Sequence, residues 1–583
     1  MKTYYTDEKN VLILIALLKE HGIRKIIASP GTTNITFVRS LQNDSFFQIY
    51  SSVDERSAAY MACGLAAESG EPVVLSCTGA TASRNYMSGL TEAYYRKLPI
   101  LAVTSTQEIS KVGHHIAQVI DRSSMPNDIV KYSVQLPLVK DNMDWWNCEV
   151  KANEAILELS RHGGGPVHIN LATGYSRLFD TKELPKVRVI KRITTQASEY
   201  PSIPKGKVAV FIGSHKKMTE TQISTLERFC ESNNAVVFCD HTSGYKGKYA
   251  VFHSLSSSQR LADYNELRPD LTIHIGEISG NYSANKIIGK QVWRVSEDGQ
   301  LRDTFRKLQY IFEMPEQVFF EYYSEKDSEE DHYLQSWRNH LEQLYKKIPE
   351  LPFSNLWIAK KIHMKIPNKS IIHFAILNSL RSWNLFELPK TVESNSNVGG
   401  FGIDGCVSAL IGASLVHKDR LYFGIIGDLA FFYDMNSIGN RHVGNNLRIM
   451  LINNGKGTEF RNFNHPAAQF GETADEFIAA GGHFGNKSKT LVRSYSESLG
   501  FEYLSASNKA EFEQVYKRFL TNQMLDNPIL LEVFTNSEDE SKALEIITSI
   551  DTTVKKKAES TIRNVIGKNN ISKIKKIIKR KVK

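Results

Sequence analysis

Short, continuously apolar segments alternate with helix-like segments along most of the chain. In the first third, a helical pattern over 8–21 is followed by β-rich runs at 24–29, 46–52, 72–78, 99–105 and 166–172. Strands that are apolar on both faces and alternate with helices are typical of a parallel sheet covered by helices on both sides. The pattern therefore predicts a doubly wound α/β domain that closes near residue 185.

The same rhythm returns twice. Further buried strands are predicted at 207–213, 235–240, 271–276 and 291–296, and after a charged, helix-like connector (321–347) at 370–375, 421–427, 447–453 and 527–534. The predicted fold class is α/β, with three doubly wound parallel-sheet domains and a basic C-terminal tail. The predicted boundaries are 1–185, 186–350, 351–553 and, for the tail, 554–583.

The most informative stretch joins two of these strands. One strand ends in Gly427-Asp428, a helix of about a dozen residues is predicted to follow, and the next strand ends in Asn453-Asn454-Gly455. Ligands bind at the carboxyl edge of a doubly wound sheet, where Asp428 and Asn454 can converge. A carboxylate, an amide oxygen and a backbone carbonyl suit Mg²⁺, and the turn that opens the helix suits a diphosphate. The alternative is a helix-capping aspartate and a turn-forming Asn-Gly pair.

A second feature is Glu55, which follows a β-run and opens an Ala/Gly-rich helix. With it, the chain resembles the thiamine-diphosphate-dependent 2-oxo-acid decarboxylases and carboligases over about residues 1–550. Within that family it is most similar to the menaquinone-pathway synthases, which join 2-oxoglutarate to isochorismate. The matching stretches are ASPGTTN (28–34), 54–85, SNSNVGGFGIDG (394–405) and the Gly-Asp to Asn-Asn unit.

The resemblance implies the cofactors and the roles of individual residues. It implies thiamine diphosphate and Mg²⁺, bound between the first domain of one subunit and the third domain of another, in a homodimer or a dimer of dimers. It implies that Glu55 activates the aminopyrimidine of the cofactor. The implied metal ligands are Asp428, Asn454 and the carbonyl of Lys456. The implied cofactor contacts are Thr78, Asn85, Asn378, Ser379, Gly402, Ile403, Gly427, Asp428, Leu429 and Ala430. Ile403, with Phe401 as the second choice, is the expected apolar wedge beneath the cofactor.

Several cationic positions of the menaquinone synthases are missing from this chain. Their Ser-Pro-Gly-Ser-Arg loop ends here in Thr32-Thr33, and no counterpart of their other cationic anchors is found in 104–110, 276–286 or 394–405. Arginine is the natural bidentate partner of carboxylates, so this loss favours a different substrate. Arg381 is a candidate to replace one anchor in part.

Four further polar residues are catalytic candidates: His114, His115, Gln118 and Glu459. A histidine pair near a glutamate could protonate a carbanion, as aldehyde release requires, although two polar loop histidines beside a surface glutamate explain the pattern equally well. The chain is thus predicted to decarboxylate a small-molecule 2-oxo acid and either transfer the acyl carbanion to an aldehyde or keto acceptor or release an aldehyde.

Three alternatives stay open. The first is the menaquinone-pathway condensation itself. The second is a nicotinamide or flavin oxidoreductase, because Gly400, Gly402 and Gly405 fit a dinucleotide fingerprint, although the segment before them is polar. The third is a catalytically silent binding protein that keeps the fold.

Charge is distributed unevenly. The chain of 583 residues has a net charge of +9, and residues 554–583 hold 12 of the 72 basic side chains but 1 of the 63 acidic ones, which leaves 60 against 62 in the rest. A nearly neutral body gives no electrostatic reason to bind nucleic acid. In the tail, Ile571, Ile574, Ile578 and Val582 form an apolar stripe among lysines, which fits peripheral contact with a membrane or an acidic partner, or a solvated end.

The cysteines and the first apolar run predict a cytoplasmic protein. The 6 cysteines show no CxxC pair and no metal-ligand spacing, which predicts reduced core residues. The early apolar run at 11–18 is too short to span a membrane and lacks the positive start of a signal peptide. We expect a cytoplasmic enzyme whose tail could contact a membrane.

Overall fold

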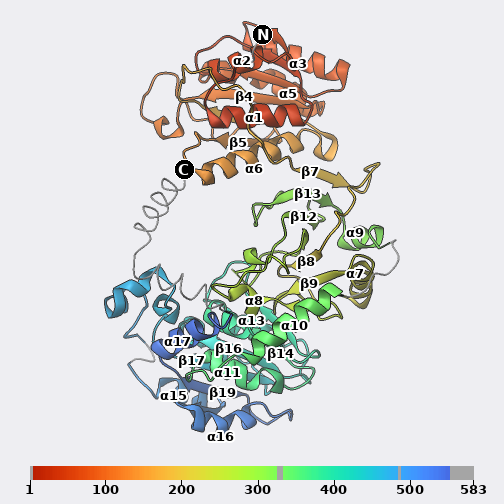
Figure 1. The fold of residues 1–583 in the computed structure, drawn as a ribbon. Helices are drawn as coiled ribbons and strands as arrows, with labels where there is room; N and C mark the ends of the chain where they lie inside the picture. Colours follow the sequence, from red (N-terminus) through yellow and green to blue (C-terminus); the bar gives the residue numbers. More distant parts are fainter. Residues whose placement is uncertain (1–3, 282, 325–331, 484–486, 552–583) are drawn as a thin grey trace, which may run out of the picture. The chain divides into compact units, whose positions relative to one another are not determined.

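The computed structural model describes residues 4–281, 283–324, 332–483 and 487–551 (Figure 1). The chain divides into two compact units, one made of 1–200 with 298–313 and the other of 201–297 with 314–583. The predicted tail, 554–583, lies outside the described residues.

The first unit is built on a parallel sheet with the strand order β2-β1-β3-β4-β6-β5. Its strands are β1 (Lys25–Ala28), β2 (Gln48–Ser51), β3 (Val73–Cys77), β4 (Ile100–Thr106), β5 (Tyr132–Leu136) and β6 (Val167–Ala172). One core cluster packs α1 (Lys9–Glu20), α2 (Ile35–Gln42) and α6 (Asn142–Glu158) on one face of the sheet. A second cluster packs α3 (Glu55–Ser69), α4 (Thr81–Asn85) and α5 (Met87–Tyr95) on the other face. Strands β7 (Lys191–Thr194) and β13 (Leu308–Glu313) pair in parallel in the same unit.

The local sequence explains why α3 begins where it does. The side chain of Asp54 caps the helix by accepting hydrogen bonds from the backbone N–H groups of Arg56 at 2.9 Å and Ser57 at 3.5 Å. The helix ends at Gly70, whose φ of 68° is left-handed, as a C-terminal glycine allows. Glu55 is therefore fixed in the first turn, beyond the carboxyl end of β2.

The second unit contains two parallel arrays of strands. The first runs β10-β9-β8-β11-β12 and the other β15-β14-β16-β17-β19-β18. The bounds of the first array are β8 (Val208–Ile212), β9 (Ala235–Cys239), β10 (Ala250–Phe252), β11 (Leu271–Ile275) and β12 (Gln291–Ser296). Those of the second are β14 (Ile371–Phe374), β15 (Glu393–Ser396), β16 (Tyr422–Gly427), β17 (Leu447–Asn453), β18 (Glu502–Ala506) and β19 (Ile529–Phe534).

Helices cover the sheets of this unit, as the apolar strands require. They are α7 (Glu220–Ser232), α8 (Ser254–Ser258), α9 (Glu316–Tyr322), α10 (His332–Lys346), α11 (Asn355–Ile362), α12 (Asn378–Trp383), α13 (Cys406–Ser414), α14 (Asp428–Tyr433), α15 (Leu491–Ser498), α16 (Lys509–Phe519) and α17 (Ser537–Ile547). Two core clusters lie on the two faces of the β14–β19 sheet. Parallel sheets between helices confirm the predicted α/β fold class.

Two sequence predictions differ from the structure in detail. The helix after Gly427 is not a dozen residues long: α14 covers Asp428–Tyr433, and a 3-10 turn, Met435–Gly439, follows it. Helix α14 ends before Asp434, whose carboxylate accepts hydrogen bonds from the backbone N–H and the hydroxyl of Ser408. Strands β5, β7, β10, β13, β15 and β18 were not predicted; they are short or only partly buried, so their apolar signal is weak.

All six cysteines are buried and none forms a disulfide. Among the described residues, no helix is long and apolar enough to cross a bilayer.

Candidate active site

A small cavity lies at the carboxyl edge of the β14–β19 sheet, where the loops after β14, β16 and β17 meet. Its volume is about 170 Å³. Ten residues predicted from the sequence line it: Asn378, Ser379, Ile403, Gly427, Asp428, Leu429, Ala430, Asn454, Lys456 and Glu459. We call this cavity the cradle. Gly402 precedes Ile403 and is not among the lining residues.

Asp428 is the central polar residue of the cradle. Its side chain is buried, Oδ1 accepts from the backbone N–H of Leu429 at 2.7 Å, and Oδ2 accepts from Asn454 at 3.1 Å and Gly455 at 2.6 Å. Burial raises the pKa of Asp428 to about 6, although these N–H groups oppose the shift. The predicted convergence of Asp428 and Asn454 across 26 positions is therefore present.

The donor set fits a hard divalent metal ion. The side-chain oxygen Oδ1 of Asn454 is buried and has no hydrogen-bond partner among the described residues. A buried amide oxygen without a partner is costly, and a cation beside Asp428 would satisfy it. The described part of the chain holds no cluster of three or more His, Cys, Asp or Glu side chains suited to a metal. A metal here would accordingly rely on one carboxylate, one amide and backbone or ligand oxygens, the pattern expected for Mg²⁺.

The turn before α12 shapes another wall of the cradle. Leu377 has a left-handed φ of 62°, and Asn378 and Ser379 follow it into the lining. Phe401 also has a positive φ, 53°, and lines the neighbouring cavity, whereas Ile403 lines the cradle. The preferred apolar wedge, Ile403, thus lies in the cradle.

Arg381 and Glu459 form a two-point ion pair at one end of the cradle. Nη1 of Arg381 lies 2.5 Å from Oε2 of Glu459, and Nη2 lies 2.9 Å from Oε1. Nη1 also donates to Oδ1 of Asn378 at 2.9 Å, and Asn462 donates to both Asn378 and Glu459. Arg381 is therefore already neutralised, and Glu459 is bound to a cation.

Among the lining residues that sequence reasoning missed, Asn355 and Glu540 come from helices outside the predicted motifs. Glu540 is buried, accepts from the backbone N–H of Asn355 at 2.9 Å and from the hydroxyl of Thr535 at 2.8 Å, and has its pKa raised to about 7 by burial. Asn355 and Glu540 lie on α11 and α17, far from the motif in sequence. No local pattern distinguishes Glu540 from its acidic neighbours in 538–540.

In the first unit, the predicted residues lie at the carboxyl edge of its sheet. Glu55 is half-buried after β2, Thr78 is half-buried after β3, and Asn85 is exposed at the end of α4. Since β1 separates β2 from β3 and neighbouring strands lie about 5 Å apart, the two strand ends are about 10 Å apart. We call this edge the open edge, because Asn85 is exposed and Glu55 and Thr78 are only half-buried.

Three further predicted catalytic residues of the first unit lie in one exposed loop after β4. His114, His115 and Gln118 are all exposed, and His115 and Gln118 have left-handed φ values of 54° and 65°. Glu459 belongs to the second unit, whereas the histidine pair belongs to the first. No single unit therefore contains all three residues.

The loop position that carries arginine in the menaquinone synthases holds a buried threonine here. Oγ1 of Thr33 donates to the carbonyl of Ser105 at 2.8 Å and lies against Oγ1 of Thr78 at 2.5 Å. Nearby, Arg122 is buried and donates through Nη2 to Asn170 at 2.7 Å, whereas its Nε and Nη1 have no hydrogen-bond partner in the described residues. Burial lowers the pKa of Arg122 to about 10.

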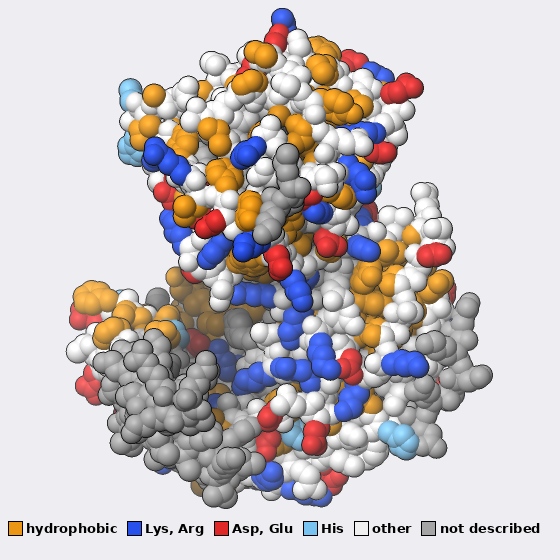
Figure 2. All heavy atoms as spheres, turned by 45° about the horizontal axis from the view of Figure 1, so that its top comes forward, with side chains coloured by type: hydrophobic (Ala, Val, Ile, Leu, Met, Phe, Trp, Pro, Cys, Tyr) orange, Lys and Arg blue, Asp and Glu red, His pale blue; other side chains and the backbone are white. Residues whose placement is uncertain are grey.

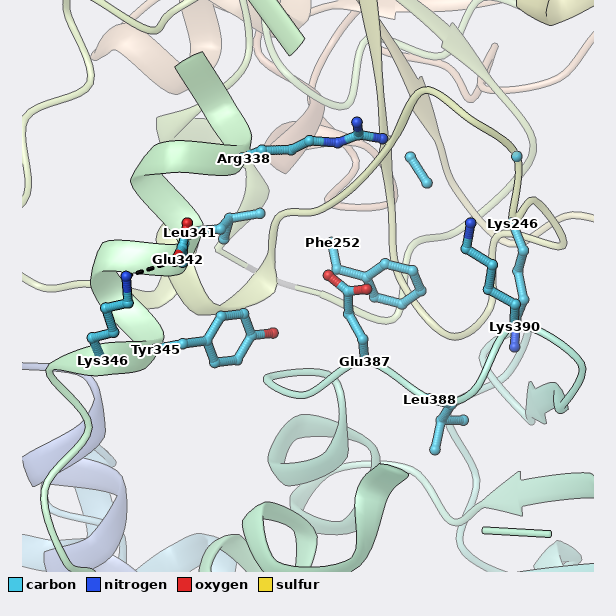
Figure 3. Close-up of a pocket in the computed structure, with 12 residues that line it drawn as sticks. Lys246, Phe252, Arg338, Leu341, Glu342, Tyr345, Lys346, Glu387, Leu388 and Lys390 are labelled. Carbon is cyan, nitrogen blue, oxygen red and sulfur yellow. Dashed lines mark ion pairs between the residues drawn. The ribbon is translucent and has the colours of Figure 1, made fainter. Parts of the chain in front are cut away.

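Larger cavities occur elsewhere in the second unit. One of about 530 Å³ lies between α10 and the segment 387–390 (Figure 3). Figure 3 shows Arg338 and Tyr345 of α10 pointing into the cavity, with Glu387 and Lys390 on its other side, and Lys346 paired to Glu342 on its own helix. None of the residues predicted from the sequence lines this cavity.

Comparisons with known proteins identify the family of the chain. Residues 11–125 match the family described as thiamine pyrophosphate enzyme, N-terminal TPP binding domain. The chain is 31% identical over 564 residues to the 2-succinyl-5-enolpyruvyl-6-hydroxy-3-cyclohexene-1-carboxylate synthase of Bacteroides fragilis, covering 93% of this chain and 98% of the relative. Enzymes with the same name from Bacteroides thetaiotaomicron and Christiangramia forsetii are 30% and 27% identical, with coverage of 93% and 90% of this chain and 98% and 95% of the relatives.

Fold, cradle and family match together define a thiamine-pyrophosphate-dependent enzyme that uses a divalent metal. Within that class, the chain belongs to the 2-succinyl-5-enolpyruvyl-6-hydroxy-3-cyclohexene-1-carboxylate synthase family.

Proposed function

We propose that this enzyme decarboxylates a 2-oxo acid and transfers the remaining acyl group to an acceptor other than isochorismate. The observation that carries the proposal is the ion pair between Arg381 and Glu459. Arg381 is the one candidate in the sequence to replace a missing cationic anchor, and both of its terminal nitrogens are bound to Glu459. A polyanionic substrate needs cations that are not already paired.

The cradle would hold the cofactor through its metal. Asp428, Asn454 and the carbonyl of Lys456 would ligate Mg²⁺, and the turn at 427–430 would lie along the diphosphate. When bound, thiamine diphosphate supplies a nucleophilic carbon and an electron sink for the loss of CO₂. Ile403 would support the cofactor from below.

Residues of the first unit would complete the chemistry. Glu55 would hold a proton on its carboxyl group and share it with a pyrimidine nitrogen, and Thr78 and Asn85 would border the ring. His114 and His115 lie on the loop after the next strand, beside the open edge, where they could protonate a product if a partner subunit encloses them, and Gln118 on the same loop could donate a hydrogen bond to it.

A homodimer would enclose this edge. Several large apolar side chains are exposed on the elements that precede or contain Glu55: Ile35, Tyr50, Val53, Tyr60 and Met61 are between 44% and 78% exposed. Figure 2 shows hydrophobic side chains gathered on the face of this unit. Contiguous exposed apolar surface marks an interaction site. In the second unit, Phe470, Phe477 and Ile478 follow the loop at 454–457 and are exposed as well.

The second candidate function is the reaction for which the relatives are named. It is favoured by similarity along almost the whole length of the Bacteroides fragilis enzyme. The two candidates differ in the acceptor and in the need for unpaired arginines.

One experiment separates them. The enzyme, reconstituted with thiamine diphosphate and Mg²⁺, is incubated with a panel of 2-oxo acids, alone and with aldehyde or keto acceptors, and CO₂ release and products are followed. We expect turnover that does not depend on isochorismate. Turnover confined to 2-oxoglutarate with isochorismate would establish the second candidate instead.

A further inference from the structure

A second cavity adjoins the cradle within the same unit. It has a volume of about 230 Å³ and shares Leu377 and Glu459 with the cradle. Its walls come from the start of α8, the loop after β11, α12 and the segment 459–464. A small molecule in this cavity would lie directly beside a cofactor in the cradle.

Each positive charge on the cavity wall has a carboxylate partner. Arg381 is bound at two points by Glu459. Arg260, at the rim, lies 3.7 Å from Glu545, and its guanidinium carbon lies 4.8 Å from the ring centroid of Phe463. A ligand carboxylate or phosphate beside Arg381 would have to displace Glu459, whereas the exposed pair of Arg260 with Glu545 contributes little. The interior of the cavity is therefore unfavourable for a polyanion.

The rest of the polar lining is uncharged. Asn384 is 3% exposed; its Oδ1 accepts from the backbone N–H of His241 at 3.1 Å, and its buried Nδ2 has no hydrogen-bond partner among the described residues. Ser254 accepts from Asn281 at 2.9 Å, so its hydroxyl proton is not needed for that bond. Other uncharged polar residues of the lining are Ser258, Ser283, Asn464 and Thr548.

A buried donor without a partner indicates a ligand oxygen. Leaving Nδ2 of Asn384 unsatisfied costs free energy that a hydroxyl or carbonyl oxygen of a ligand would recover. The apolar side chains Leu377, Leu385, Phe401, Phe463 and Leu544 form the rest of the wall. The lining therefore matches a compact molecule with hydroxyl groups and a carbon skeleton, and no net charge.

We propose that this cavity binds the acceptor, and that the acceptor is an uncharged hydroxylated aldehyde or ketone of the sugar type. This inference rests on the proposed function. In the reaction, the bond between the keto carbon and the carboxylate of the 2-oxo acid breaks and CO₂ leaves without the bonding pair. That pair forms the new bond to the carbonyl carbon of the acceptor, and the acceptor oxygen takes one proton from solvent.

Two probes that differ only in a phosphate group test the assignment. The binding of dihydroxyacetone and of dihydroxyacetone phosphate to the enzyme loaded with thiamine diphosphate and Mg²⁺ is titrated by saturation-transfer NMR. We expect dihydroxyacetone to bind at least about tenfold more tightly, because only the phosphate would have to break the ion pair between Arg381 and Glu459. Tighter binding of the phosphate, or no saturable binding of either probe, would overturn the proposal.

Two variants locate the binding. Asn384→Asp keeps the acceptor for His241 and removes the donor, so we expect it to weaken dihydroxyacetone by about tenfold. Glu459→Gln releases Arg381, so we expect it to favour the phosphate probe by about tenfold. Glu545→Gln, which makes the same charge change at the rim, is the control and should change the preference by less than about threefold. Unchanged affinities in Asn384→Asp would contradict the assignment.

Exchange of the cofactor C2 hydrogen for deuterium, measured on the same samples, tests the proposed function separately. If exchange is absent while the preference for the uncharged probe holds, the proposed reaction fails and the character of the cavity stands. If exchange occurs and the preference is reversed, the acceptor class fails and the cofactor chemistry stands.

Discussion

The sheet of the first unit and the β14–β19 sheet, called the first and third sheets below, differ in how far one chain encloses their carboxyl edges. At the third sheet, Asp428 is buried and held by three backbone N–H groups, and the cradle around it is closed by α12 and α17. At the first sheet, Glu55 is half-buried and the histidine loop is exposed. The proposed metal site would thus depend on internal hydrogen bonds, whereas the proposed proton-transfer edge would depend on a surface that another subunit covers.

The largest expected effect falls on the open edge. Glu55→Gln should slow C2 deuterium exchange of bound thiamine diphosphate by about 10²- to 10⁴-fold, because an amide cannot share a proton with the pyrimidine as a carboxyl group does. Exchange is measured by NMR after acid quench. Glu68→Gln, at an exposed position of the same helix, is the matched control and should exchange normally. A wild-type rate in Glu55→Gln would remove this residue from the chemistry and the open edge from the active site.

The next largest effect is expected at the cradle, on the carboxyl edge of the third sheet. Asn454→Ala should weaken Mg²⁺-dependent cofactor binding by at least about 10- to 100-fold, the range known for the loss of groups that merely support metal ligands. Cofactor titration at several Mg²⁺ concentrations, followed by intrinsic fluorescence, measures it. Asn522→Ala, at an exposed position outside the cradle in the same unit, serves as the comparison. Equal affinities in the two variants would show that Asn454 is only a turn residue.

The proposed subunit contact over the open edge can be disrupted directly by a mutation. Met61→Lys places a charge among the apolar side chains near Glu55. Burying a methionine side chain stabilises by about 1.5–3 kcal/mol, so we expect the dimer dissociation constant to rise by about 10- to 100-fold. Sedimentation equilibrium measures the constant. Met364→Lys, also at an exposed methionine (58%), should leave association unchanged. If both variants stay equally associated, this surface is not the interface.

The two edges also differ in how far the sequence predicts them. The Asp428 and Asn454 motif is local to consecutive strands, and parallel-sheet geometry brings the two residues to one edge whatever the rest of the chain does. The ion pair of Arg381 with Glu459 joins residues 78 positions apart, and Glu540 reaches the cradle from α17. Such contacts depend on how loops and helices pack over the sheet, which apolar periodicity does not encode. The sequence signal of a strand is its run of apolar residues, and this run reflects burial. Highly buried strands were therefore predicted, whereas β15 and β18 were missed.

The smallest effect concerns the core beneath the open edge. His168, on β6, is fully buried between the hydroxyls of Thr104 at 2.7 Å and Ser133 at 2.8 Å, and burial lowers its pKa from 6.5 to about 3. Below pH 6.5 the unfolded chain binds a proton here that the folded chain does not, so the free energy of unfolding falls as pH falls, by about 1.4 kcal/mol per pH unit from this group. The full contribution is present above pH 6.5 and is lost progressively towards pH 3.

His168→Gln should therefore reduce the slope of the unfolding free energy between pH 6 and pH 5 by about 1.4 kcal/mol per pH unit, whatever it does to the stability at pH 7. Urea unfolding, followed by a probe in the first unit, measures the slope. His417→Gln, at an exposed position of the second unit, should leave it unchanged. Because the histidine pair at the open edge is exposed and His168 is enclosed, a slope that did not respond to His168→Gln would mean that the core under this edge opens to solvent before the unit unfolds. The contrast between a closed third sheet and an open first sheet would then extend from the surface of the first unit into its interior.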